Sequence, residues 1–326
     1  MLKKRNIIAV SVCLLSFGLM ALGSGSQSSG SKKDITKPKE AVDASVDENL
    51  NEDTAETSGN EETKGKTGGL GNEDGQSQAS NVTIEKQTLV DRDGIRITAE
   101  EYTTDSIWGD GIKLLIENNA DKDYTIGCDA LIVNDYMISD LFASTVAAGK
   151  KATETMYLSS SQLNAAGIKS VGKIEMYFHA TDDNLDRLFS KVYSEIKTSE
   201  YSNMDTEADD SGTELYNNNG VRIVGKTVDE NSFWGTAILL FLENTSGRNV
   251  SIHVDDMSVN GFMMTPYFSS TVYDGKKAIE DITLLSSELE ENGIDSINEV
   301  ELKFRITDAD TYDTIDESDN ISFSAK

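Results

Sequence analysis

The residue types that most often carry enzyme chemistry are scarce in this sequence. The 326 residues include two histidines, His179 and His253, and contain no His-Glu-x-x-His motif, no Cys-x-x-Cys motif and no glycine-rich phosphate loop. A hydrolytic triad needs a histidine beside a nucleophile. We interpret both histidines as ordinary surface or strand-edge residues, and we expect no enzymatic activity, no catalytic residue, no zinc site and no cofactor.

Carboxylates are abundant and suggest calcium as a possible ligand. The segments 182–186 and 308–313 each hold several aspartates. Calcium takes about six to eight oxygen ligands from a loop shaped by glycine, and neither segment has the spacing or the glycine of an EF-hand. We therefore expect solvated acidic loops and no metal site, with calcium binding as the alternative.

Four aromatic residues are the best candidates for recognition. Trp108 and Trp234 each precede a glycine and a buried strand, and Tyr136 and Phe262 lie in two matching turns. An exposed aromatic ring on a loop makes contacts that a rigid β framework can hold in place. The alternative is that these rings fold onto a core, and for the two tryptophans we favour a role in sealing one end of it.

The charge balance excludes one class of partner. The sequence has 29 Lys and Arg against 57 Asp and Glu, a formal net charge of −28. Nucleic acids are bound through basic clusters that release counterions, and no such cluster follows the first five residues. We expect no nucleic-acid partner, and the same electrostatics disfavour an anionic membrane surface.

The elements that position these residues are present twice. Gly94-Ile95-Arg96-Ile97 matches Gly220-Val221-Arg222-Ile223, and the same offset of 126 residues continues without a gap to Asp182 and Asp308. Of the 89 positions aligned in this way 35 are identical, which chance does not produce. The folded part of the chain therefore consists of one unit repeated in tandem.

Each copy has the pattern of a β-protein. Residues 112–117 and 238–243 are short apolar strands that run into polar turns, and a further strand follows each turn. A short helix is predicted after Ser160 and after Ser286, where hydroxyls cap the start and Gly167 or Gly293 ends it. Several short strands in about 115 residues indicate a sandwich of two sheets.

These motifs resemble a known group of domains. The Glu-Asn pairs at 117–118 and 243–244, the Val-Asn pairs at 133–134 and 259–260, and Gly-Lys-Lys-Ala from Gly149 and from Gly275 carry the resemblance. The group comprises immunoglobulin-like domains of unknown function, often in tandem, in exported proteins and lipoproteins of Gram-positive bacteria. The resemblance implies an all-β fold of two tandem immunoglobulin-like β-sandwich domains and no catalytic residues.

The N-terminus has the features of an export signal. Three basic residues at 3–5 precede an apolar stretch at 7–22 and small residues at 23–24. An uncleaved membrane anchor is the alternative. The region around Ser24 resembles a lipoprotein signal, but lipid transfer needs a cysteine at that position. Cys128 is then the one cysteine of the mature chain, and we expect a small buried apolar residue there.

The organisation follows from these segments. We predict a signal peptide at 1–23, a disordered polar linker at 24–81, the first repeat at 82–199, an acidic linker at 200–212 and the second repeat at 213–326. We expect an exported protein, extracellular or associated with the cell envelope, that acts without catalysis as a binding or interaction module for an unknown cell-surface or extracellular ligand. A structural or spacer protein is the alternative, and a carboxylate-based hydrolase is a remote one.

Overall fold

The computed structural model describes residues 32–37, 82–139, 141–205, 207–232 and 235–325. Strands make up most of this part, which confirms the all-β prediction, and two six-residue helices accompany them, α1 (Ser160–Ala165) and α2 (Ser286–Glu291). Both helices begin at the predicted serines, but no side-chain hydroxyl caps either start, so the predicted capping is wrong. The predicted signal peptide, Trp234 and most of the predicted linker lie outside the described residues.

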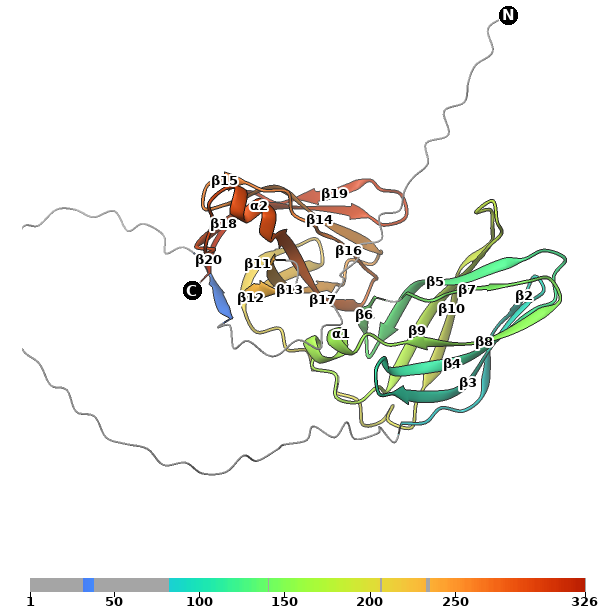
Figure 1. The fold of residues 1–326 in the computed structure, drawn as a ribbon. Helices are drawn as coiled ribbons and strands as arrows, with labels where there is room; N and C mark the ends of the chain where they lie inside the picture. The colour runs from blue at the N-terminus through green and yellow to red at the C-terminus, as the bar shows by residue number, and fades with distance from the viewer. Residues whose placement is uncertain (1–31, 38–81, 140, 206, 233–234, 326) are drawn as a thin grey trace, which may run out of the picture. The chain divides into compact units, whose positions relative to one another are not determined.

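The first repeat contributes strands to two sheets (Figure 1). A four-stranded antiparallel sheet has the order β2 (Gln87–Arg92), β3 (Ile95–Asp105), β4 (Gly109–Asn118), β8 (Lys150–Tyr157). The remaining strands belong to a larger sheet: β5 (Tyr124–Val133), β6 (Tyr136–Ile138), β7 (Ala143–Val146), β9 (Lys173–Thr181) and β10 (Arg187–Lys197). Buried and less buried positions alternate along β9, as a half-covered strand requires.

The second repeat has the same element order, except that two strands, β19 and β20, replace the single strand β10. Its strands are β11 (Thr213–Asn218), β12 (Val221–Ser232), β13 (Gly235–Asn244), β14 (Val250–Val259), β15 (Phe262–Met263), β16 (Ser269–Val272), β17 (Lys276–Leu285), β18 (Glu299–Asp308), β19 (Thr314–Glu317) and β20 (Ile321–Ala325). The bounds of β5 and β14 differ by 126 residues at both ends, as do those of α1 and α2. The internal repetition seen in the sequence is therefore also a repetition of elements.

A 16-stranded sheet contains strands from both repeats. Its order is β10-β9-β5-β6-β17-β13-β12-β1-β20-β18-β14-β15, with β7, β11, β16 and β19 paired to its sides. The pairs are antiparallel except between β6 and β17, where Tyr136 lies beside Lys277 in a parallel register. The sheet is therefore mixed, and this single parallel contact joins the strands of the two repeats.

Each repeat has its own apolar core. The core of the first repeat is formed mainly by residues such as Ile97, Ile116 and Phe178, and that of the second by residues such as Ile223, Leu242 and Phe304, all fully buried. Val224, Phe241 and Ile279 of the second repeat pack with the core of the first. Burying aliphatic and aromatic side chains on this scale is the main source of stability for a chain without disulfides.

The Glu-Asn motif has a structural explanation. Asn118 is fully buried at the end of β4, and its side-chain amide donates 2.8 Å hydrogen bonds to the carbonyl oxygens of Lys122 and Val146. Asn244 makes the same two bonds, also 2.8 Å, to Arg248 and Val272. Both asparagines thus satisfy backbone groups that the following turn leaves unpaired.

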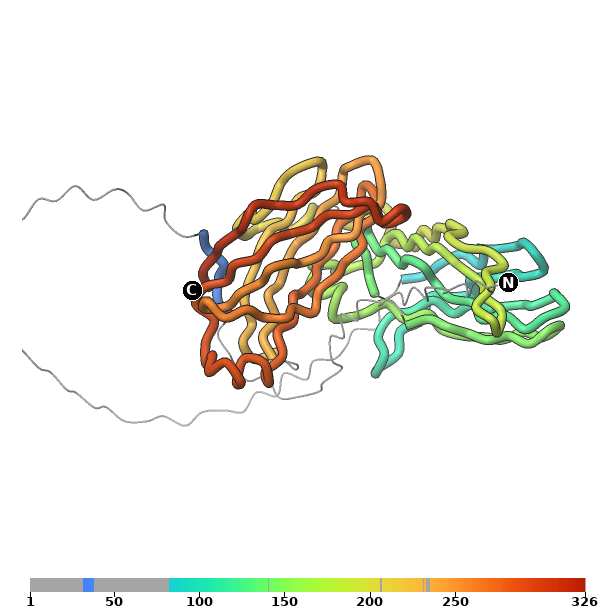
Figure 2. The backbone as a smooth tube through the Cα atoms, turned by 90° about the horizontal axis from the view of Figure 1, so that it is seen from above, coloured from blue at the N-terminus to red at the C-terminus, as the bar shows by residue number. Residues whose placement is uncertain are grey.

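One strand differs from the sequence-based expectation. Residues 33–36, inside the predicted disordered linker, form β1 (Lys33–Thr36) between β12 and β20 of the second repeat. In Figures 1 and 2 this blue segment lies beside the C-terminal strand. The linker prediction is wrong for these four residues, because backbone pairing and burial of one isoleucine order them. No helix in the described ranges is long and apolar enough to cross a bilayer.

Candidate functional site

The turn between β3 and β4 holds Trp108 in a defined position. Oδ1 of Asp105 accepts hydrogen bonds from the backbone amides of Ile107, at 2.7 Å, and Trp108, at 2.9 Å. The bonds from Trp108 and Ile107 favour the carboxylate and lower the pKa of Asp105. The carboxylate therefore organises the backbone from which both apolar side chains project.

The same turn is anchored to the neighbouring segment. Gly109 has φ of +79°, and a methyl group at this position would overlap the hydroxyl of Ser160 at the start of α1. Oδ1 of Asp110 accepts a 2.7 Å hydrogen bond from the Thr104 hydroxyl, and the backbone carbonyl oxygen of Asp110 accepts a 2.8 Å bond from the amide of Leu158. The left-handed backbone conformation thus favours glycine after the tryptophan, and any side chain there would also displace the Ser160 hydroxyl.

Three apolar side chains are exposed at this end of the first repeat. Ile107 is 74%, Trp108 51% and Tyr157 38% exposed, and the ring centroids of Trp108 and Tyr157 are 6.1 Å apart. We call these three residues the indole surface. The prediction that a tryptophan seals the core is wrong for Trp108, because half of its surface is exposed. Leu158 and Leu163, on either side of Ser160, are buried in the core of this repeat.

The indole surface can bind a ligand but has no evident catalytic group. An indole and a phenol held side by side offer flat apolar faces on which a sugar ring or an apolar side chain can stack. The phenol and indole also carry a hydrogen-bonding group each. The sequence pointed to Trp108 but missed Tyr157, whose position next to the turn follows from the pairing of Gly111 with Tyr157 across β4 and β8.

Tyr136 does not lie on an exposed loop tip. It is 5% exposed in β6, beside Lys277 of the second repeat, whose Nζ is 5.8 Å from the centroid of the Tyr136 ring. Burial, with smaller contributions from nearby carboxylates, raises the pKa of Tyr136 to about 12. The prediction of Tyr136 as a ligand-binding residue therefore fails on accessibility, because strand pairing with the second repeat covers it.

Phe262, at the equivalent position of the second repeat, is exposed. Its side chain is 47% exposed in β15, and that of Met263 is 67% exposed. The two equivalent aromatics thus have opposite environments, and Phe262 retains the accessibility expected of a recognition residue. Trp234, the fourth predicted residue, lies outside the described residues.

The two histidines have different surroundings. Nδ1 of His179 lies 3.0 Å from Oδ1 of Asp129. His253 lies within 3.3 Å of the hydroxyls of Ser269 and Thr307, and burial, with Arg305, lowers its pKa. A hydrolytic triad has a hydroxyl on one ring nitrogen of its histidine and a carboxylate on the other. His253 has a hydroxyl on each, from Ser269 and Thr307, so it lacks the arrangement of a triad.

The aspartate-rich segments cap their own turns. Oδ1 of Asp182 accepts hydrogen bonds from the amides of Asn184, at 3.0 Å, and Asp186, at 3.1 Å. Asp308 does the same for Asp310 and Thr311, at 2.9 and 3.0 Å. Within the part of the chain that the structure covers, no group of three or more His, Cys, Asp or Glu is placed to hold a metal ion.

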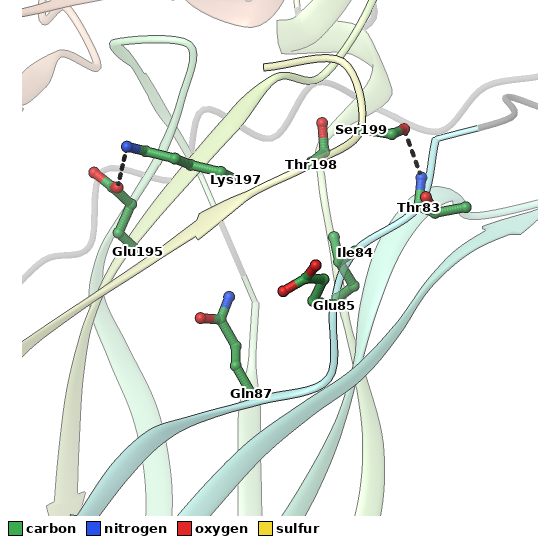
Figure 3. A pocket seen from close by; sticks show the side chains of 8 residues that line it. All are labelled: Thr83, Ile84, Glu85, Gln87, Glu195, Lys197, Thr198 and Ser199. Atoms are coloured by element: carbon green, nitrogen blue, oxygen red, sulfur yellow. Dashed lines mark hydrogen bonds and ion pairs between the residues drawn. The ribbon is translucent and has the colours of Figure 1, made fainter. Parts of the chain in front are cut away.

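A polar groove of about 550 Å³ lies where the first repeat begins (Figure 3). It is lined by Thr83, Ile84, Glu85, Gln87, Glu195, Lys197, Thr198 and Ser199. Lys197 lies 3.6 Å from Glu195, and the amide of Thr83 donates a 3.1 Å hydrogen bond to the Ser199 hydroxyl. This groove has mixed charge and offers fewer apolar contacts than the indole surface.

No family model and no curated protein matches the chain. Among solved structures, the YadV chaperone aligns at 12% identity over 66% of this chain and 91% of its own, with a TM-score of 0.21. The exo-chitosanase CsxA of Amycolatopsis orientalis aligns at 13% identity over 64% of this chain, with a TM-score of 0.23. The aligned part spans 25% of the chitosanase. Neither likeness carries an argument about function.

Proposed function

We propose that this chain is an exported, non-enzymatic protein of the cell envelope, built of two tandem immunoglobulin-like domains. Its first repeat binds a carbohydrate of the envelope through the indole surface. The observation that carries this proposal is the exposure of Ile107 and Trp108 on a turn fixed by Asp105 and Gly109, with the exposed Tyr157 of β8 beside them. Exposed apolar side chains held rigidly in one place are typical of binding sites.

The charge of the chain is consistent with a neutral or basic ligand. A net charge of −28 disfavours polyanions, and stacking on an indole requires no ligand charge. Asp105 lies three residues before Trp108 in the chain and Asp110 two residues after it, and carboxylates accept hydrogen bonds from sugar hydroxyls. A neutral or amino sugar polymer therefore fits this surface better than a teichoic acid or a nucleic acid.

Cosedimentation with purified insoluble cell-wall polysaccharide tests the proposal. The wild-type mature chain should pellet with the polysaccharide, and Trp108→Ala or Tyr157→Ala should lower the affinity at least about tenfold, as loss of a central aromatic contact does. Tyr312→Ala is the matched control, because Tyr312 is 71% exposed in the second repeat, away from this turn. This control should bind as the wild type does.

A spacer role makes a different prediction. If the protein only spans distance at the cell surface, the folded wild-type chain stays in the supernatant with every neutral and basic polysaccharide offered, and Trp108→Ala changes nothing. A hydrolytic role would show instead as soluble sugar released by wild-type protein and lost on changing one carboxylate.

Export is tested separately. Mass spectrometry of the N-terminus from fractionated cells should find a chain beginning near Ser24 outside the cytoplasm. An intact Met1 in the membrane fraction would support a retained anchor, and an intact Met1 in the cytoplasm would contradict export.

A further inference from the structure

Strand β1 adds a segment from far along the chain to the second repeat. It pairs antiparallel with β12 through its first two residues and with β20 through its last two, so it bridges these two strands. The pairs are Lys33 with Val228, Asp34 with Thr227, Ile35 with Ala325 and Thr36 with Ser324. Without β1, both β12 and β20 would expose unpaired backbone groups along this seam.

The seam contains an apolar pocket for one side chain. Ile35 is 3% exposed and belongs to the core of the second repeat. Gly225 makes room for it, because a methyl group there would lie 2.9 Å from Cδ1 of Ile35. The hydroxyl of Thr213 donates a 2.5 Å hydrogen bond to the carbonyl oxygen of Ile35. The isoleucine is thus held by both its side chain and its backbone.

A second contact recognises a cation. Nζ of Lys33 donates hydrogen bonds to Oε1 of Glu230, at 2.8 Å, and to the hydroxyl of Ser296, at 2.6 Å. The amide of Ile297 donates a 2.6 Å bond to the same Glu230 oxygen. Burial disfavours the carboxylate, but these donors outweigh it and lower the pKa of Glu230. The carboxylate is therefore held in place by the repeat itself and is ready to receive an ammonium group.

The first repeat fills the equivalent place with its own chain. Ile84 pairs with Thr198, and the amide of Ser199 donates a 2.9 Å hydrogen bond to the carbonyl oxygen of Thr83. By their pairing with β9 and β18, Lys197 and Thr198 are the equivalents of Ser324 and Ala325, the residues that pair with β1. The first repeat thus needs no strand from elsewhere.

The residues that receive β1 are specific to the second repeat. At the offset of 126 residues, Gly225 corresponds to Ala99 and Glu230 to Thr104. The isoleucine in the equivalent place of the first repeat, Ile84, is only partly buried, whereas Ile35 is 3% exposed, and Thr104 supplies no carboxylate for a lysine. The two halves differ at the positions that contact Ile35 and Lys33, which points to recognition of this segment rather than incidental packing.

We propose that the second repeat carries a binding slot for an extended peptide, and that residues 33–36 of the same chain occupy it. The peptide pattern is a lysine followed two residues later by a β-branched apolar residue. Main-chain pairing supplies affinity and the two pockets supply selectivity, as in other cases where a peptide adds a strand to a sheet.

The covalent connection permits occupation within one chain. Forty-five residues separate Thr36 from Val82, where the first repeat begins, and such a length reaches at most about 150 Å. Tethering gives an effective concentration on the order of millimolar for short linkers. A free peptide therefore competes poorly with the built-in strand, and a test with added peptide needs a chain whose own strand is disabled.

The test uses hydrogen exchange of the full mature chain and its Ile35→Asp variant. Burying a carboxylate in place of isoleucine should release β1 and speed exchange in β12 and β20 by about 10- to 100-fold, the effect of losing one buried aliphatic side chain. Exchange in β3 and β10 of the first repeat should not change. A synthetic peptide of residues 31–38 added to the variant should restore protection, and the same peptide with aspartate at position 35 should not.

A second variant keeps the test decisive. Lys33→Glu places two carboxylates together outside the core, so it should release the strand while the second repeat stays folded, as judged by circular dichroism. Unchanged exchange in β12 and β20 in both variants, or no protection by the wild-type peptide, would overturn the slot. A wild-type dimer that becomes monomeric on Ile35→Asp would overturn occupation by the same chain, because a second copy would then donate the strand.

Discussion

Glu280 is the residue whose ionisation opposes folding most clearly. It is partly buried and lies on the same face of β17 as Ala278 and Ile282, both fully buried in the core of the second repeat. Burial, together with the neighbouring Asp281 carboxylate, raises the pKa of Glu280 from 4.5 to about 8. Between these two values the folded chain binds more protons than the unfolded chain, so the free energy of unfolding falls as pH rises through that window.

Glu280→Gln should remove this fall in the free energy of unfolding with rising pH. Near pH 5 the variant and the wild type should have similar free energies of unfolding, and at about pH 8.5 the variant should be more stable, by no more than about 1.4 kcal/mol per unit of pKa shift. Urea denaturation at the two pH values measures this. Glu154→Gln changes the equivalent but exposed residue of the first repeat and should be neutral at both. Equal pH dependence in wild type and Glu280→Gln would refute the assignment.

At the scale of elements, the turn between β3 and β4 depends on Gly109. Gly109→Ala should destabilise the chain by more than about 2 kcal/mol, because a side chain there both adopts a left-handed conformation and overlaps Ser160. Gly149→Ala is the control: its φ is +66°, but no atom lies within 4 Å of the added methyl. It should cost only about 1 kcal/mol. Equal losses in thermal denaturation would mean that the contact with α1 has no role.

The elements themselves were largely predictable from the sequence. The strand class, the repeat and the helices after Ser160 and Ser286 follow from local patterns and an offset of 126 residues. Strand β1 was not predictable, because four residues within a polar stretch carry no periodic signal and are ordered by a partner more than 190 residues away in β12. Propensity and periodicity report local preference, whereas this strand depends on a distant contact.

The candidate site was predictable only in part, for a similar reason. Tyr136 and Phe262 occupy equivalent turns, yet one is 5% and the other 47% exposed. The difference arises from the pairing of β6 with β17, which involves the turn of one repeat only. Sequence alone located Trp108 as a candidate but not its exposure, because that depends on Asp105, Gly109 and the position of α1.

At the scale of the whole molecule, a buried ion cluster joins the repeats. Nζ of Lys276 lies 2.7 Å from Oδ1 of Asp135 and 2.5 Å from Oε2 of Glu175, and Lys173 is 2.7 Å from the same Asp135 oxygen. Glu175 is 6% exposed. Burial disfavours the Asp135 carboxylate, but the two lysines outweigh it and lower its pKa. Removing one lysine would leave a buried carboxylate incompletely neutralised.

Lys276→Ala should therefore weaken the coupling between repeats. We expect a loss on the order of 2–3 kcal/mol, with a single unfolding transition in calorimetry for the wild type and two separate transitions for the variant. Lys150→Ala removes the equivalent, exposed lysine of the first repeat and should leave the transition unchanged. A single transition at the wild-type temperature in Lys276→Ala would show that the cluster does not couple them.

Fluorescence of one indole tests the proposed binding function most directly. The chain has two tryptophans, so Trp234→Phe leaves Trp108 as the sole indole. Stacking of a sugar on this half-exposed ring should remove water and give a saturable blue shift as soluble envelope polysaccharide fragments are added. Saturation that Tyr157→Ala weakens at least about tenfold would support the account. A folded Trp234→Phe chain whose emission stays constant at every concentration of every neutral and amino-sugar fragment would contradict it.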